Sequence, residues 1–439
     1  MVSSRFPAWA RVDSQRETVM TESPLGLRAL LITGILACCI GCSKKVDPPG
    51  TATLEFWHIQ TYEPTGPAID RAVQRLSVAA PGITVETQAI ENDAFKIKLM
   101  SSMGVKSPPD VFHTWGGGIL STYVDGDRVV DLSTHFNDLS RFHPAALQFC
   151  SVNDTLYALP VDVAVVPMWI NPELFAKAGV EPPKTLDELL AVSKQLRAAG
   201  ITPIALGNSK SWPGALYFAY LASRLGGTEP IEQRQFDAPS FIEAGQWINK
   251  LVAADTFSKG FNGLSADDSY RQFLTGEAAM ILMGPWLVAK AQKQAPEMVA
   301  KMKCIPFPAA GKNADWDAIA VGGVNAAYAI ASTSKSIDSA VQLLSALTDD
   351  TAMSEWAGTG RLPALTREAA TPMLAAETRA LAEILFTSTT IQLYYDQLLA
   401  PPLATAHKET TQAIFAGAMT PEAAAQQMLK VKKSVEDRK

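Results

Sequence analysis

The sequence has no excess of positive charge and few cysteines. Lysine and arginine number 38 against 44 aspartates and glutamates, which gives a net charge of −6. Proteins that bind nucleic acid through its phosphates need a basic surface, so this balance argues against nucleic acid as a partner. Of the five cysteines, only Cys150 and Cys304 lie beyond residue 42. We place these two in different halves of the protein and expect free, buried thiols.

Sequence signatures of common catalytic sites are also missing. The chain contains no His-Glu-x-x-His and no Gly-x-Ser-x-Gly, and its cysteines lack zinc-like neighbours. The glycines at 116–118 are not followed by the lysine of a phosphate-binding loop. Asp267 and Asp268 are adjacent at a predicted helix start, where acidic residues favour the helix dipole. We therefore expect a protein that is not an enzyme, with no catalytic residue, metal or cofactor.

Long apolar runs are confined to the front of the chain, and no later run approaches the ~20 residues of a membrane-spanning helix. Arg28 precedes an apolar stretch at 29–40, and Gly41 precedes Cys42. A charged flank, an apolar stretch of this length and a small residue before a cysteine are typical of an export signal.

This front end resembles a bacterial lipoprotein signal. The resemblance implies a signal segment at 1–41, with Met20 as an alternative start, and Cys42 as the lipidated first residue of the mature chain. The polar stretch 42–51 then reads as a tether. Cys38 is the alternative lipidation site, and an uncleaved hydrophobic anchor is the alternative to a processed signal.

The whole chain, at 439 residues with 47% apolar residues, is long enough for two lobes beyond this front end. Strand-like and helix-like patterns alternate from Ala52 onward, which predicts α/β lobes, each a mostly parallel sheet flanked by helices. The apolar run 157–175 contains Asp162 and is bracketed by Pro160 and Pro167. It predicts a strand buried on both faces that passes through a hinge. The run 319–330 is the expected return crossing.

Ligands of open parallel sheets bind beyond the carboxyl ends of the strands. The residues that follow the predicted strands there are Trp57, His58, Gln60, Trp115, Asp162, Trp212, Trp286 and Asn325. Tryptophan offers a flat apolar face with one donor, which matches the C–H face of a sugar ring. Each residue also has a structural interpretation: a tryptophan can be core, His58 can be a bonded loop histidine, and Asp162 can bond a hinge amide.

Several short segments, in this order and spacing, resemble the extracellular solute-binding proteins of ABC importers, in the carbohydrate-binding group that includes maltose-binding protein. The matching segments are Leu54–Trp57, Pro109–Phe112, Tyr157–Pro160, Asn171–Gly179, Pro182–Leu189, Gly200–Ala205, Phe273–Met280, Gly284–Trp286, Gly322–Gly323 and Gly360–Ala364.

The resemblance implies a two-lobed periplasmic-binding-protein-like fold with interlaced lobes. Residues 52–161 and about 320–372 would form lobe 1, and 163–317 and about 378–439 would form lobe 2. In relatives the loop after the first strand, the tryptophan after Gly-Pro and the loop after Gly-Gly contact ligand, here Trp57, His58, Trp286 and Asn325. Trp169 stands where the family usually has tyrosine, and we leave it out of the site.

We expect an anchored monomeric receptor outside the cytoplasm that binds a small carbohydrate and delivers it to an ABC permease in the cytoplasmic membrane. Arg361 is the one strong cation expected in the cleft, which favours a neutral sugar over a glycerol phosphate. The alternatives are a receptor for such a phosphate or another polar solute, a surface glycan hydrolase, and a sugar-binding chemosensory or scaffold protein.

Overall fold

A computed structural model describes residues 51–437, apart from the side chain of Glu377. The predictions for the signal segment, Cys42 and most of the tether concern residues outside this part. The first predicted strand is present as β1 (Ala52–His58), in which Ala52, Leu54 and Phe56 are buried while Thr53 and Glu55 are exposed. This alternation is the period-2 pattern that the sequence carries.

The larger sheet has six strands and holds the start of the described chain. Its order is β12 (Ile391–Leu393), β11 (Ala320–Ile330), β3 (Val111–Thr114), β1 and β2 (Ile83–Ala89), with β6 (Leu159–Val165) also paired to β11. β1 runs parallel to β2 and β3, but β11 runs antiparallel to β3 and β6. The sheet is thus more mixed than strand–helix alternation predicts. β6 and β11 are neighbours in this sheet, but the chain leaves the sheet after β6 and returns to it through β11, so the two strands run in opposite directions.

The second sheet has four strands in the order β10 (Lys303–Ile305), β7 (Met168–Ile170), β9 (Ala278–Leu282) and β8 (Thr202–Ala205). The apolar run that starts at Tyr157 gives two strands, β6 and β7, rather than the single strand predicted. Pro167 separates them because it has no N–H to donate, while its carbonyl accepts from the amide of Met283 at 3.3 Å. Pro160 lies inside β6 opposite Ala327 rather than bracketing it. Every residue of both strands is buried, as predicted.

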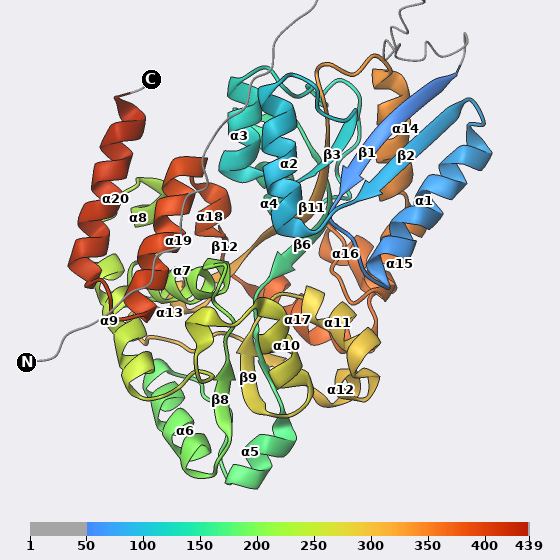
Figure 1. The fold of residues 1–439 in the computed structure, drawn as a ribbon. Helices are drawn as coiled ribbons and strands as arrows, with labels where there is room; N and C mark the ends of the chain where they lie inside the picture. Colours follow the sequence, from blue (N-terminus) through green and yellow to red (C-terminus); the bar gives the residue numbers. More distant parts are fainter. Residues whose placement is uncertain (1–50, 438–439) are drawn as a thin grey trace, which may run out of the picture. The chain divides into compact units, whose positions relative to one another are not determined.

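Figure 1 shows β6 and β11 between the two groups of elements, with β1–β3 on one side and β8 and β9 on the other. A small hairpin joins β4 (Ser151–Val152) to β5 (Thr155–Leu156). The helices of the first part are α1 (Thr65–Ala79), α2 (Asn92–Gly104), α3 (Gly117–Asp125), α4 (Pro144–Phe149), α14 (Ile337–Thr348), α15 (Asp350–Gly358), α16 (Arg367–Ala370) and α17 (Ala376–Thr387), with a 3₁₀ turn at Thr371–Met373.

The remaining helices surround the second sheet. They are α5 (Pro172–Ala178), α6 (Leu186–Ala198), α7 (Trp212–Gly226), α8 (Glu229–Glu232), α9 (Pro239–Ala253), α10 (Ala266–Leu274), α11 (Trp286–Gln294), α12 (Pro296–Lys301), α13 (Ala314–Asp317), α18 (Tyr395–Leu398), α19 (Pro401–Phe415) and α20 (Pro421–Glu436), with a 3₁₀ turn at Phe261–Gly263. Two of these helices begin with side-chain caps: the Asn171 side chain accepts from the amide of Glu173, and Thr185 forms a capping box with Glu188.

The buried side chains separate into distinct clusters. The first draws on residues 54–165 and 320–385 and packs around the larger sheet. The other two draw on residues 166–307 and 393–428, with a small contribution from β11. The tail beyond Ser336 is not wholly helical, because β12 interrupts it and joins the first sheet. Three residues are too few for a recognisable strand pattern.

Both remaining cysteines are free, as expected. Cys150 is buried in the first cluster, and burial raises the pKa of its thiol. Cys304, in β10 of the second sheet, is only half-buried rather than buried, and desolvation raises its pKa to about 11.

Candidate functional site

The loop after β1 carries the first predicted contacts. His58 ends β1 and is 1% exposed, and burial lowers its pKa to about 4, so the imidazole is neutral. Its Nδ1 accepts from the backbone amide of Gln60 at 3.1 Å, which fixes the tautomer with the proton on Nε2. That Nε2 is buried and has no partner among the described residues. The Gln60 side chain is also buried and accepts from Arg361 at 3.5 Å.

Asp162 lies in the middle of β6 with both carboxylate oxygens occupied. Oδ1 accepts from the backbone amides of Asn325 at 2.9 Å and Ala326 at 2.7 Å, where β11 changes register against β6. Oδ2 accepts from the indole N–H of Trp356 at 3.2 Å and from Nη1 of Arg361 at 3.1 Å. The sequence argument that a buried carboxylate requires polar partners is thus satisfied, and the hinge-amide interpretation of Asp162 describes part of what is seen.

The ion pair between Asp162 and Arg361 is almost completely buried, with 1% and 4% of the side chains exposed. Burial raises the pKa of the Asp162 carboxyl, while the guanidinium and the three N–H donors oppose that rise. For Arg361, desolvation is outweighed by Tyr62 and Asp162, and its pKa is raised. Its Nη2 also donates to the Tyr62 hydroxyl at 3.0 Å. The pair therefore links the crossing strands to the loop after β1.

Trp212 and Trp286 meet on the second sheet's side. Each is the first residue of its helix, α7 or α11, and their ring centroids lie 6.1 Å apart in an edge-to-face arrangement. The Trp286 indole donates to the Tyr270 hydroxyl at 3.1 Å. Gly284 lies two residues before Trp286, and a Cβ at this position would overlap the Trp286 ring. Both tryptophans are only half-buried, at the edge of the core clusters of the second sheet.

Lys290 joins the two groups. Its ammonium lies 4.8 Å from the ring centroid of Tyr62 and 5.9 Å from that of Tyr270, and 3.0 Å from the carboxylate of Asp267. Tyr62 belongs to the loop after β1, while Tyr270 and Lys290 belong to α10 and α11. Gln60, Asp162, Asn325 and Arg361 are therefore connected through Tyr62 and Lys290 to Trp286 and Trp212.

Trp57 and Trp115 have other surroundings. They are 6% and 5% exposed and belong to the first core cluster. Trp57 donates its indole N–H to Glu55 at 2.7 Å, and Trp115 lies 4.6 Å from the His113 ring. A lysine ammonium of α2 lies over each indole ring. Most of the surface of these two rings is therefore packed in the core, as the structural interpretation of each tryptophan expected.

Four residues were not selected from the sequence, namely Tyr62, Tyr270, Lys290 and Trp356, the last of which donates to Asp162. Tyr62 lies four positions beyond His58 in the loop already selected, so its place was visible. Lys290 is four residues after Trp286, and residues at that spacing share a helix face. Tyr270 offered no signal, because a tyrosine inside an amphipathic helix is normally core. Trp169, left out of the site, is core: it is 1% exposed and donates to the carbonyl of Met283 at 2.7 Å.

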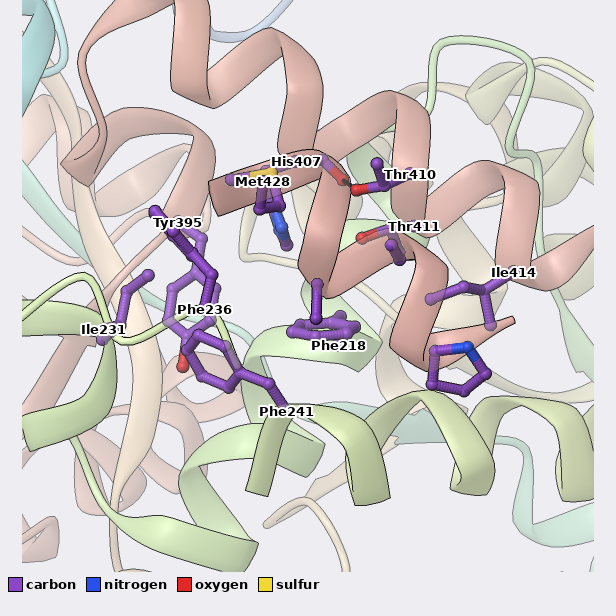
Figure 2. Close-up of a pocket in the computed structure, with 13 residues that line it drawn as sticks. Phe218, Ile231, Phe236, Phe241, Tyr395, His407, Thr410, Thr411, Ile414 and Met428 are labelled. Carbon is purple, nitrogen blue, oxygen red and sulfur yellow. Dashed lines mark hydrogen bonds between the residues drawn. The ribbon is translucent and has the colours of Figure 1, made fainter. Parts of the chain in front are cut away.

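Figure 2 shows a separate, small cavity between α7, α9, α19 and α20. Its volume of about 20 Å³ has room for about one water molecule and none for a sugar. It is lined by Phe218, Tyr395 and His407 among others, and burial lowers the pKa of His407 to about 3. Within residues 51–437, no three His, Cys, Asp or Glu side chains are grouped as metal ligands, and no helix is long and apolar enough to span a membrane.

Comparison with known proteins gives the family. A family model for bacterial extracellular solute-binding proteins matches residues 62–354. An extracellular-binding protein of an ABC transporter from Pyrococcus horikoshii is 26% identical over 306 residues, 64% of this chain and 67% of that protein. The multiple sugar-binding protein of Streptococcus mutans is 25% identical over 215 residues, 47% of this chain and 50% of that protein. The chain thus matches about half to two thirds of these relatives' length.

Solved structures agree. One from work on xylan utilization by Caldanaerobius polysaccharolyticus has a TM-score of 0.80 and 28% identity, covering 86% of this chain and 99% of that one. A chitin oligosaccharide binding protein, at 23% identity, shares the fold with a TM-score of 0.81, covering 88% of this chain and 98% of that one. The predicted two-lobed α/β fold and the family resemblance are confirmed. This chain belongs to the bacterial extracellular solute-binding proteins, a family of binding proteins rather than enzymes.

Proposed function

We propose that this protein binds a sugar or oligosaccharide between its two lobes and delivers it to an ABC import permease. The observation that carries the proposal is the contact of Lys290 with Tyr62, because it connects the half-buried tryptophans of α7 and α11 to the polar groups around Arg361. Flat aromatic faces beside fixed hydrogen-bonding groups suit a sugar ring. Relatives described as sugar-binding and oligosaccharide-binding proteins support the same class of ligand.

Binding would act by closing the lobes. Hinge closure is the established motion of periplasmic binding proteins. A ligand shifts the balance only by its preference for the closed form, and a change from 1:99 to 99:1 requires about 5.5 kcal/mol. Contacts from both lobes supply such a preference, since only closure brings them onto one molecule. The lobe limits that we propose are those predicted, 52–161 with about 320–372 and 163–317 with about 378–439.

The proposed setting is extracytoplasmic. A lipid anchor at Cys42, with Cys38 as the alternative, would hold a monomeric receptor on the membrane beside its permease. Several acyl chains at ~0.8 kcal/mol per buried methylene are enough for stable anchoring. Labelling cells with a radioactive fatty acid tests this: Cys42→Ala should abolish labelling, and label that persists would move the anchor to another residue such as Cys38. A wild-type protein that takes up no label would refute the anchor.

Trp286→Ala tests the ligand site. We expect sugar affinity to fall at least tenfold in calorimetry, because a stacking face and its Tyr270-oriented edge are both lost. Trp247→Ala is the control, since Trp247 is another half-buried tryptophan, on α9, outside both residue groups. Affinity that is unchanged in a folded Trp286→Ala protein would remove Trp286 from the site. A screen with glycerol phosphate alongside the sugars tests the alternative ligand.

A further inference from the structure

The two tryptophans at the strand ends of the larger sheet are each covered by a lysine ammonium. Lys98 Nζ lies 3.8 Å from the ring centroid of Trp57, and Lys96 Nζ lies 5.0 Å from that of Trp115. Both distances fall within the ~6 Å range of cation–π attraction. Both lysines belong to α2 and are two residues apart, so one helix covers with two cations the two indoles that the sequence placed in the ligand site and that are 6% and 5% exposed.

Neither ammonium has a carboxylate partner. Among the described side chains, ion pairs up to 4.0 Å involve neither Lys96 nor Lys98. Lys98 donates to the neutral amide oxygen of Gln88 at 2.5 Å. The negative charges that act on Lys96 come from Asp396, Asp93 and Glu91, with Lys408 opposing them, and none of these carboxylates is within that distance.

Lys290 gives the contrast inside the same protein. It also lies over aromatic rings, those of Tyr62 and Tyr270, but its ammonium is paired with Asp267 at 3.0 Å. The nearest carboxylate to Trp57 in the hydrogen-bond network, Glu55, is bonded to the indole N–H rather than to Lys98. The two α2 lysines are therefore half-buried cations whose charge no described carboxylate pairs.

We propose that the ligand is an acidic sugar, carrying a carboxylate or sulfate that Lys98 and Lys96 bind when its ring stacks on Trp57 or Trp115. This inference rests on the proposed function and names the class of sugar. A ring that stacks on either indole must displace the ammonium from it. With a neutral sugar the displaced cation loses its contact and gains no counter-charge. With an acidic sugar the displaced ammonium loses its contact with the indole but gains a charge-assisted hydrogen bond to the ligand.

The same reasoning revises the expectation of a neutral sugar. That expectation took Arg361 as the single cation of the cleft, but its charge is matched by Asp162. The unpaired positive charge instead comes from α2, a helix that buries Phe95, Leu99 and Met103. Lys96 follows the inward Phe95 and Lys98 precedes the inward Leu99, so periodicity gave no reason to select them.

Matched sugar pairs provide the test. Calorimetry measures the binding of four matched pairs to the wild type and to Lys98→Met. The pairs are galactose and galacturonate, glucose and glucuronate, galactose and its 6-sulfate, and xylo-oligosaccharides with and without a glucuronosyl branch. We expect at least one acidic member to bind about tenfold or more tightly than its neutral partner, the value of one charge-assisted hydrogen bond. That preference should fall at least tenfold in Lys98→Met and weaken with added salt.

Lys98→Arg keeps the charge and should retain the preference, which guards against a fold defect in the methionine variant. Lys106→Met is the matched control, because Lys106 is an exposed lysine just beyond the same helix. If neutral members bind as tightly as acidic ones, or Lys98→Met keeps the preference, this inference is overturned while the proposed function stands. If no sugar of either kind binds, both are refuted.

Discussion

Arg361→Met should be among the most destabilising single changes in the described chain. The variant leaves the Asp162 carboxylate buried with three N–H donors and no cation, at a side chain that is 1% exposed. Removing one partner of a buried ion pair typically costs about 3–5 kcal/mol, because the remaining charge is uncompensated. Methionine keeps most of the volume, so the loss reports charge rather than a cavity. Native stabilities are about 5–15 kcal/mol, so this is a large fraction.

Urea unfolding followed by circular dichroism measures the loss. Arg271→Met is the matched control: its pair with Glu277 has a 2.7 Å contact, but both side chains are about half exposed, at 53% and 51%. An exposed pair contributes less than about 1 kcal/mol. In the double variant Asp162→Asn/Arg361→Met the loss should be smaller than the sum of the single losses.

The pH dependence gives a second check on the same variant. Without Arg361, the cation that opposes the raised pKa of Asp162 is gone, so that pKa rises further. Protonation then removes the uncompensated charge, and the deficit of Arg361→Met relative to wild type should shrink as pH falls. Equal losses in Arg361→Met and Arg271→Met, or a deficit that grows toward acid, would refute the account of a charge-compensating pair.

Two further predictions concern stability. Wild-type stability should fall as pH drops below about 6.5, the ordinary histidine value, because His58 at about 4 and His407 at about 3 bind fewer protons folded than unfolded. The difference between the folded and unfolded pKa of His58 alone corresponds to about 3 kcal/mol of unfolding free energy. Urea midpoints from pH 7 to 4.5 measure how stability depends on pH, and this dependence should be weaker in His407→Gln. Gly116→Ala should destabilise more than Gly179→Ala: both have positive φ, at +72° and +67°, but only the first Cβ would overlap a backbone oxygen, that of Phe149. Thermal melts of the two variants compare them, and equal losses would contradict this view.

Local patterns predicted most strands and helices because they depend on residues close in sequence. Local features of this kind are the capping box at Thr185, the helix start at Ser265 and the alternation in β1. Strand direction did not follow, because it is set by which segments pair across the fold. β10 and β12, at three residues each, are held by their partners rather than by a pattern of their own. The sequence singled out Pro167, but as a residue at the edge of one strand, whereas it separates two strands.

The candidate site also has a part that the sequence predicts and a part that it does not. A single charge inside an apolar run located Asp162 as a place where polar groups must converge, since an unpartnered buried carboxylate is too costly to persist. Its partners are 163 to 199 positions away in the chain, so no window of sequence contains them. Strand ends likewise located Trp286, but its partner Tyr270 lies inside a helix, and so does Lys290, which lies over the ring of Tyr270. Sequence therefore identifies where an unusual residue requires partners, and the packing of distant segments decides which residues those are. Lys96 and Lys98 differ from Asp162 in this respect, because no described carboxylate pairs with either ammonium, and an acidic ligand can supply that charge.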